Sequence, residues 1–584
     1  MNEAHQDRLS SVARLSLVLL AFGLPFETVI FNVGALRVTT LEALLALVVL
    51  PTAIVVARQL VHSRSSSRLP FPRVWLALWA LIAIALLLST LLAPEFRLNA
   101  ARASGRILAG MGLALSTAVL LGGRPQPERR KDLLWIVIAL LAGGFISVVA
   151  GFVETITGVA LSALDAFRVV PTNVGPFIRL TGSFDHANQT AMFLESTLPL
   201  LLAVTLLLHR RRSCLALVAA VVVILWLQAA VATYSRASLA SIMISSLLVA
   251  ALLWLGHDRR DLRRSLPWAA LAAGVFALLV LNALFDPVVR LRLRTEGDNE
   301  WYALNFDIPQ TLTVDAGRTV TTTITVQNQG AMTWTSTAPV IVRVGGHWYL
   351  PDEDLSLDFQ PRWNLPEPVA PGEEVTMRVG LRAPLDAGDY RFHWDLVQEN
   401  VTWFSYKNGV RASTLISVEE SSAPIPPSDA TQLALSRVVG APPDVAPVPG
   451  RATLWRIAAN EFLQRPLLGI GLDNFRLIYG RGLDYEVWND TIHSNSWYVE
   501  MVVSLGLLGA IPFFAWAVLF GLSFVRVLRR PQVTVWQVAL AASLMTFFIH
   551  GAVDYFLSAN STGLLFWLLS GLWVMVDKET VSVV

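Results

Sequence analysis

Four short polar segments interrupt an otherwise apolar chain, and they carry the residue types that could do chemistry. The first covers residues 179–188 and places Arg179 and Asn188 directly before an apolar helical run. The second, residues 234–237, is a turn between two apolar runs and contains Arg236. A helix N-terminus favours anions, and the planar arginine fork suits a phosphate. An arginine near a helix end can also extend to lipid headgroups, so Arg236 alone leaves both functions open.

The other two segments precede the last apolar runs. The third begins at Arg451, continues as a helical pattern and reaches a glycine-rich turn that contains Asn474. The fourth places His493 and Asn495 directly before the apolar run that starts at Tyr498. Imidazole is the side chain best suited to proton transfer near pH 7, although a single histidine at a helix edge is more often structural. His493 is therefore a candidate general base, and its assignment depends on its neighbours.

The elements that must position these segments are long apolar helices. Of the 584 residues, 54% are hydrophobic and 15% are charged, with a mean hydropathy of +0.55, which is too apolar for one soluble core. About twelve runs approach the roughly 20 residues that cross a bilayer, so the sequence predicts a polytopic α-helical membrane protein with about 12 transmembrane helices. The runs cover residues 11–30, 36–57, 74–92, 104–121, 133–152, 187–208, 215–232, 239–255, 266–285, 498–525, 535–557 and 564–576.

Arginine and lysine in the short loops predict the orientation, because positive charge next to helix ends is retained in the cytoplasm. Every second loop carries such a cluster, which predicts cytoplasmic termini and an extracytoplasmic location for residues 286–496. The first run ends in Gly23, Pro25 and Glu27 without a small-x-small cleavage site, so we expect a retained span. The predicted location is the cytoplasmic (inner) membrane. The clusters lie within residues 58–73, 124–131, 210–212, 259–264 and 526–530.

Composition excludes several other classes of protein. The net charge is +2, and the arginines gather in loops instead of forming a basic stripe with interleaved aromatics, so no nucleic-acid partner is expected. Cys214 is the only cysteine, which excludes an intrachain disulfide and a cysteine-based zinc cluster. The outer region must therefore be stable through packing alone.

Residues 308–420 change to the period-two pattern of β-strands, separated by glycine-containing turns. So many short strands predict an inserted extracytoplasmic β-sandwich of the immunoglobulin type. Its tryptophans resemble those of the four-tryptophan Ig-like domain found in bacterial surface proteins and in an autophagy receptor. Tryptophans at strand spacing more often form a core than a sugar platform, and contact with carbohydrate or protein through this domain is left open. The four tryptophans of this pattern are Trp334, Trp348, Trp394 and Trp403.

The chain therefore divides into six segments, of which the fourth is rich in proline and lacks periodicity. They are transmembrane helices 1–9 (residues 1–290), a connector (291–307), the Ig-like sandwich (308–420), a proline-rich linker (421–450), an extracytoplasmic catalytic loop with an interfacial helix (451–496), and transmembrane helices 10–12 (497–584).

The polar segments together resemble the O-antigen ligase and O-antigen polymerase family of bacterial membrane glycosyltransferases. The resemblance spans nearly the whole chain except the β insert. In that family a second histidine often follows the first at the last motif, and here Asn495 stands in its place. The matching positions are Arg179, Gly182 and Asn188; Ser235 and Arg236; Arg451, Trp455, Pro466, Gly469, Gly471, Asn474 and Phe475; and His493.

The resemblance implies transfer of a glycan from an undecaprenyl diphosphate carrier to an acceptor hydroxyl on the outer side of the membrane. It implies no cofactor, no nucleotide sugar and no required metal, and the acceptor would be a glycan, a lipid or a protein. The catalytic residues would be His493 as general base, with Arg236 and Arg451 on the diphosphate. The residues expected to bind substrate are Arg179, Asn188, Asn474 and Asn495.

Three other functions remain open at this stage. A repeat-unit polymerase for O-antigen or exopolysaccharide would use the same donor chemistry. A polytopic transporter of glycolipid or polysaccharide would need ionisable groups among its helices, for which Glu154, Glu195, His550 and Asp554 are candidates. A surface-anchored binding module would need one span only, and it would leave the four polar segments unexplained.

Overall fold

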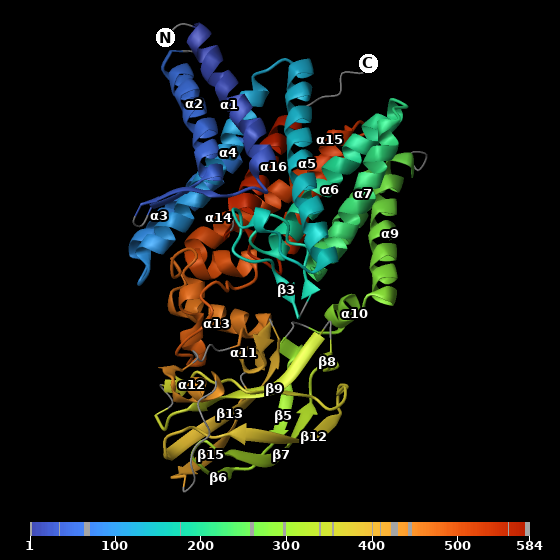
Figure 1. Cartoon of the computed structure of the whole chain (residues 1–584). Coiled ribbons are helices and arrows are strands. Elements are labelled where there is room, and N and C mark those ends of the chain that lie inside the picture. Colours follow the sequence, from blue (N-terminus) through green and yellow to red (C-terminus); the bar gives the residue numbers. More distant parts are fainter. Residues whose placement is uncertain are drawn as a thin grey trace.

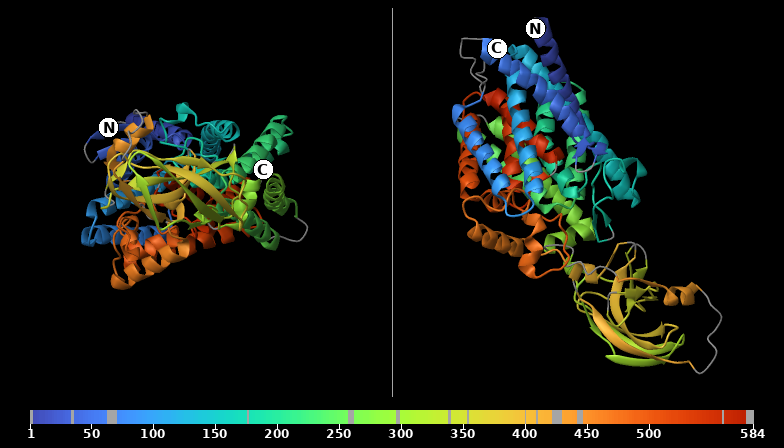
Figure 2. Two further views of the ribbon diagram at one scale, coloured as in Figure 1. Left: turned by 60° about the horizontal axis from the view of Figure 1, so that its bottom comes forward. Right: turned by 90° about the vertical axis from the view of Figure 1, so that its left-hand side faces the viewer.

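The structure is a computed structural model in which a bundle of long helices carries a β domain at one end (Figure 1). Both termini lie at the opposite end of the bundle, and the β domain extends away from it (Figure 2). The described residues are 3–33, 36–62, 71–175, 177–256, 262–295, 299–337, 340–352, 355–399, 401–408, 410–421, 430–441, 447–558 and 560–577.

A helix occupies each of the apolar runs. In the part of the chain that the structure describes, nine helices are long and apolar enough to cross a membrane; α1, α15 and α16 fall outside that set. The predicted α-helical architecture with apolar helices is thereby confirmed. The helices are α1 (Glu3–Gly23), α2 (Thr40–His62), α3 (Arg73–Leu92), α4 (Arg97–Gly122), α5 (Gln126–Thr157), α6 (Ala187–Arg210), α7 (Leu215–Ala232), α8 (Arg236–Gly256), α9 (Leu262–Phe285), α14 (Trp497–Leu528), α15 (Val535–His550) and α16 (Asn560–Asp577).

The first two helices differ from the predicted runs. Helix α1 ends at Gly23 instead of continuing to Ile30, and strands β1 (Val29–Val33) and β2 (Leu36–Thr39) form an antiparallel hairpin before α2. Pro25 cannot continue a helix, and the β-branched residues that follow favour extended backbone. The run predicted over residues 535–557 likewise ends early, at His550, where the chain enters a tight turn.

The β domain has two sheets, in the orders β12-β7-β5 and β16-β10-β9-β13-β15-β6. Trp334, Trp348 and Trp394 are fully buried between them, which agrees with a core role. Strand β5 comes from the predicted connector and β16 from the predicted linker, because both segments pair with sheet edges. The strands are β5 (Leu304–Asp307), β6 (Thr311–Asp315), β7 (Thr319–Asn328), β8 (Ser336–Thr337), β9 (Val340–Tyr349), β10 (Leu355–Leu357), β11 (Arg362–Asn364), β12 (Glu374–Arg382), β13 (Gly388–Gln398), β14 (Thr402–Trp403), β15 (Ala412–Glu419) and β16 (Val438–Gly440).

The β domain is packed against the loops of the helical bundle. Its apolar core includes Val174 from the hairpin β3 (Asn173–Val174) and β4 (Phe177–Ile178), and Val288 from α10 (Pro287–Arg294). Figure 1 shows this hairpin pointing from the bundle toward the β domain. The hairpin continues directly into the segment that holds Arg179, and Arg236 donates to the carbonyl of Thr295, which follows α10, so the β domain contacts the surroundings of the predicted site.

Candidate functional site

A cavity of about 640 Å³ lies among the loops at the end of the bundle that faces the β domain. It is walled by the β1–β2 hairpin, by α4, by the N-terminal ends of α6 and α16, and by the loops before α14 and after α15. Its polar lining consists of Glu27, Thr39, Glu42, Arg106, Asp185, His186, Asn188, Gln189, Thr491, His493, Asn495, Asp554, Tyr555, Asn560 and Thr562.

Three of the residues predicted from sequence line this cavity together. They are His493, Asn495 and Asn188, and the structure brings them side by side although some 300 residues separate them in the chain. Arg179 and Arg451 lie behind the wall, each bonded to a lining or neighbouring residue. Arg236 and Asn474 are not among the lining residues.

Arg179 and Asn188 are held by the segment that starts α6. The Arg179 guanidinium donates from Nε to the Thr233 carbonyl at 2.7 Å and from Nη2 to Asn188 Oδ1 at 2.8 Å. Gly182 makes the turn between them, with φ +58°, and a Cβ there would come within 2.4 Å of Ser147 Oγ. Only glycine adopts this conformation without strain in so tight a space.

The turn after α15, residues 551–555, connects the other site residues. Arg451 donates from Nε to the Val553 carbonyl at 3.1 Å, and Asn188 donates from Nδ2 to Asp554 Oδ2 at 3.3 Å. The Tyr555 ring packs against the His493 ring with centroids 5.1 Å apart. Sequence reasoning singled out Asp554 only as a buried ionisable group of a transporter, because no motif marks this turn.

His493 has an acidic neighbour that sequence reasoning missed. Its Nδ1 lies 3.3 Å from Asp473 Oδ1, and Asp473 in turn pairs with Arg476 at 3.0 Å. Asp473 stands inside the glycine-rich turn, next to Asn474, so its acidic side chain in that motif was the available signal. Among the described residues Nδ1 has no hydrogen-bond partner, and the nearby carboxylate can stabilise the ring electrostatically when the ring takes up a proton.

Asn474 and Arg236 make internal contacts instead. Asn474 is buried, and its Nδ2 donates to the carbonyls of Glu95 and Ile470 at 3.1 and 2.9 Å, which fixes the turn that presents Asp473. Arg236 donates from Nη1 to the Thr295 carbonyl at 2.7 Å, on the chain segment that leads into the β domain. The catalytic role predicted for Arg236 and the binding role predicted for Asn474 stay predictions.

The cavity wall is mixed in charge. Among the lining residues that the structure describes, Arg106 of α4 is the one arginine, and it faces a wall that also carries four carboxyl groups. Burial raises the pKa of Glu27, while the hydrogen bond from Asn560 Nδ2, at 2.6 Å, acts in the opposite direction. In the described part of the chain, no three histidine, cysteine or acidic side chains come together as a metal site. The lining therefore suits a polar organic substrate, and among the described lining residues Arg106 is the place for an anionic group.

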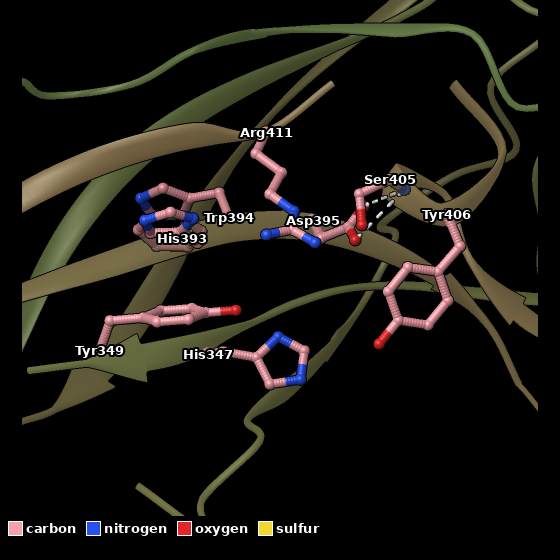
Figure 3. A pocket seen from close by; sticks show the side chains of 8 residues that line it. All are labelled: His347, Tyr349, His393, Trp394, Asp395, Ser405, Tyr406 and Arg411. Atoms are coloured by element: carbon pink, nitrogen blue, oxygen red, sulfur yellow. Dashed lines mark hydrogen bonds between the residues drawn. The ribbon is translucent and has the colours of Figure 1, made fainter. Parts of the chain in front are cut away.

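A second polar pocket, in the β domain, is too small to be the site (Figure 3). It measures about 10 Å³, room for about one water, and is lined by side chains such as His347, His393 and Asp395. Burial raises the pKa of Asp395 to about 7 and lowers the pKa of His347 to about 4. We regard this pocket as part of the domain's own core.

Comparison with known proteins identifies the β domain. Residues 307–408 match the family described as the Ig-like domain from next to BRCA1 gene. No curated protein matches the chain. The predicted insertion of an Ig-like domain into an α-helical chain is confirmed by this match together with the two packed sheets.

Proposed function

We propose that this protein is a membrane glycosyltransferase of the O-antigen ligase type, which moves a glycan from undecaprenyl diphosphate to an acceptor hydroxyl. The observation that carries the proposal is the shared cavity. Asn188 from the first polar segment and His493 and Asn495 from the fourth line one space, and Asp473 from the third segment stands behind the histidine. A general base with a carboxylate close to it, in a large polar cavity among helix ends, is what such a transfer needs.

In the proposed reaction, the acceptor hydroxyl oxygen attacks the anomeric carbon of the carrier-linked sugar. The bond from that carbon to the diphosphate oxygen breaks, and its electron pair leaves with undecaprenyl diphosphate. His493 takes the hydroxyl proton on Nε2, and Asp473, 3.3 Å from Nδ1, stabilises the resulting imidazolium.

The departing diphosphate needs positive charge beside it. Arg106 is the arginine that the cavity wall offers directly, while Arg179 and Arg451 add positive charge one hydrogen bond behind the wall. Stabilisation of the charge that develops on a leaving group commonly contributes more to the rate of such a reaction than any other effect. Arg236, predicted to act on the diphosphate as well, lies outside the cavity lining and donates to the Thr295 carbonyl, so the proposed reaction does not depend on it.

The proposed location is the cytoplasmic (inner) membrane, with both termini in the cytoplasm and the Ig-like domain outside. Support comes from the nine apolar helices of the described chain and from the many leucine and isoleucine side chains exposed on them. The termini and the Ig-like domain lie at opposite ends of the bundle (Figure 1), as this orientation requires. Membrane lipid would then surround the bundle.

The test is the variant His493→Ala, expressed in cells from which the wild-type gene has been removed. We expect glycan on the carrier to accumulate and transferred glycan to fall about 100-fold or more, because a general base contributes about that factor. Mass spectrometry of carrier-linked and acceptor-linked glycan measures both. The matched control is His209→Ala at the far end of α6, which should behave as wild type.

Transfer at the wild-type rate by a correctly inserted His493→Ala protein would refute the assignment. The same mass spectra report where the glycan becomes attached. Attachment to a lipid or protein acceptor supports a ligase, whereas lengthening of carrier-linked glycan identifies a repeat-unit polymerase. Uptake or export of intact glycolipid without any bond change would identify a transporter.

A further inference from the structure

A chain of ionisable groups leads from the bundle interior to the cavity. Glu195 on α6 and His550 at the end of α15 are 0% and 1% exposed, and Glu195 Oε1 lies 2.9 Å from His550 Nδ1. The other ring nitrogen, Nε2, faces Asp554 Oδ2 at 3.7 Å. Asp554 lines the cavity, and its side chain is 24% exposed. This series of ionisable side chains therefore ends at the cavity, where substrate would bind.

Such a chain has no evident structural purpose. Removing a carboxylate and an imidazole from water is energetically costly, and well-packed apolar residues would often stabilise the same place better. Each ring nitrogen of His550 faces a carboxylate oxygen, and when both carboxylates are ionised only the doubly protonated ring can donate to both sides. In that state His550 is a fixed cation that holds Asp554 as an anion at the cavity wall.

Asp554 retains capacity for a further hydrogen bond. Its Oδ1 accepts from the Tyr555 backbone N–H at 2.7 Å, and its Oδ2 accepts from Asn188 Nδ2 at 3.3 Å. A carboxylate offers about four acceptor positions, so a donor arriving through the cavity can still be bound. The neighbouring residues in the turn contact Arg451 on one side and His493 on the other. Asp554 is therefore placed beside the group that would deprotonate the acceptor.

We propose that Asp554 contacts substrate, accepting a hydrogen bond from a hydroxyl or amino group of the acceptor sugar, and that His550 and Glu195 are positioning residues for it. This inference rests on the proposed function. Three further carboxyl groups, Glu27, Glu42 and Asp185, line the same cavity. The acceptor class that fits is a neutral or amino sugar, and a sugar acid is disfavoured by repulsion.

The experiment uses the full-length protein in lipid nanodiscs and measures binding of defined probes. Undecaprenyl diphosphate probes the carrier site, and the octyl glycosides of glucose, glucosamine and glucuronic acid probe the acceptor site. We expect wild type to bind the glucosaminide at least ten times more tightly than the glucuronide. Asp554→Asn should remove this preference while undecaprenyl diphosphate binding stays unchanged, and Asp554→Glu should restore most of it.

His550→Gln should also reduce the preference for the glucosaminide over the glucuronide, because the cation beside Asp554 is lost. The control is Asn282→Ala, which removes an amide pair with Gln228 inside the bundle and should leave all probes unaffected. An Asp554→Asn protein that keeps the full preference overturns the inference. If wild type fails to bind undecaprenyl diphosphate, the proposed function itself is wrong, so the two failures are distinguishable.

Discussion

At the scale of single residues, the surroundings of His493 decide what the histidine can do. Asp473, close to its Nδ1, precedes the histidine by 20 residues, and Tyr555, whose ring packs against the imidazole, follows it by 62 residues. Neither contact is part of a histidine motif. A lone histidine is usually structural, and these two neighbours are what makes His493 a candidate base.

Two buried groups of the Ig-like domain predict how its stability depends on pH. The pKa of Asp395 is raised from 3.8 to about 7 by burial, so its protonated form is favoured in the folded state and stability falls as pH rises from about 4 to 7. The pKa of His347 is lowered from 6.5 to about 4 by burial, so stability rises with pH between about 4 and 6.5. The two effects oppose each other over most of this range.

We therefore expect Asp395→Asn to expose the histidine effect. Unfolding of the Ig-like domain, followed by hydrogen exchange of the β13 amides in the full-length protein, should show stability rising between pH 4 and 6.5 by up to about 1 kcal/mol per pH unit. Wild type should be flatter over the same range. A stability of the variant that falls with pH in this window would contradict the expectation.

At the scale of elements, the break inside α14 holds the glycine-rich turn in place. Gly506 has φ +57° and ψ −163°, a backbone conformation open to glycine alone. The opened helix bonds to the turn, with Leu507 N–H donating to the Pro466 carbonyl at 2.7 Å and Gly471 N–H donating to the Ser504 carbonyl at 3.0 Å. This pairing fixes the segment that presents Asp473 to His493.

Gly506→Ala should consequently destabilise the protein and loosen this turn. A Cβ at that position would lie 2.4 Å from the backbone carbon of Leu467, and the positive φ adds strain, so we expect a loss of about 3 kcal/mol or more. Thermal unfolding in nanodiscs measures it. The matched control in the same helix is Gly521→Ala, where a Cβ meets nothing within 4 Å and stability should hold or rise slightly. Equal effects of the two substitutions would argue against the pairing.

At the scale of the whole molecule, the Ig-like domain is attached to the bundle through a shared core. Trp301 is 1% exposed and packs in that core; its Nε1 donates to Thr295 Oγ1 at 3.0 Å. The Thr295 carbonyl accepts the hydrogen bond from Arg236. A Cβ on Gly175 would come within 2.8 Å of the Trp301 ring, so the β3–β4 hairpin touches it closely. The domain thus supports the loops around the site.

Trp301→Ala should release this connection. We expect faster hydrogen exchange in residues 173–178 and 287–295, and a loss of about 3 to 5 kcal/mol in the stability of the Ig-like domain, while α14 exchanges as before. The control within the domain is Leu415→Ala, an exposed position on β15. Unchanged exchange in residues 173–178 would show that the domain is not coupled to the bundle loops.

A separate expectation concerns removal of the domain. Deletion of residues 308–418 should disturb acceptor choice more than donor cleavage.

The sequence by itself determined the apolar helices, the strands of the insert and three of the lining residues. These depend on patterns within one segment: runs of about 20 apolar residues, period-two alternation, and polar motifs at helix ends. The prediction was wrong at the β1–β2 hairpin, because its apolar residues were read as parts of the neighbouring apolar helices.

Only the tertiary structure decided which polar residues meet. The bonds of Asn188 to Asp554 and of Glu195 to His550 join residues 366 and 355 positions apart. No pattern within a segment encodes such pairings, because they result from how α6 and α15 pack side by side. The same packing separates Arg236 and Asn474 from the cavity and brings Arg106 to it. The residues that line the candidate site are therefore decided by the packing of the helices. This packing determines which part of each polar segment faces the cavity.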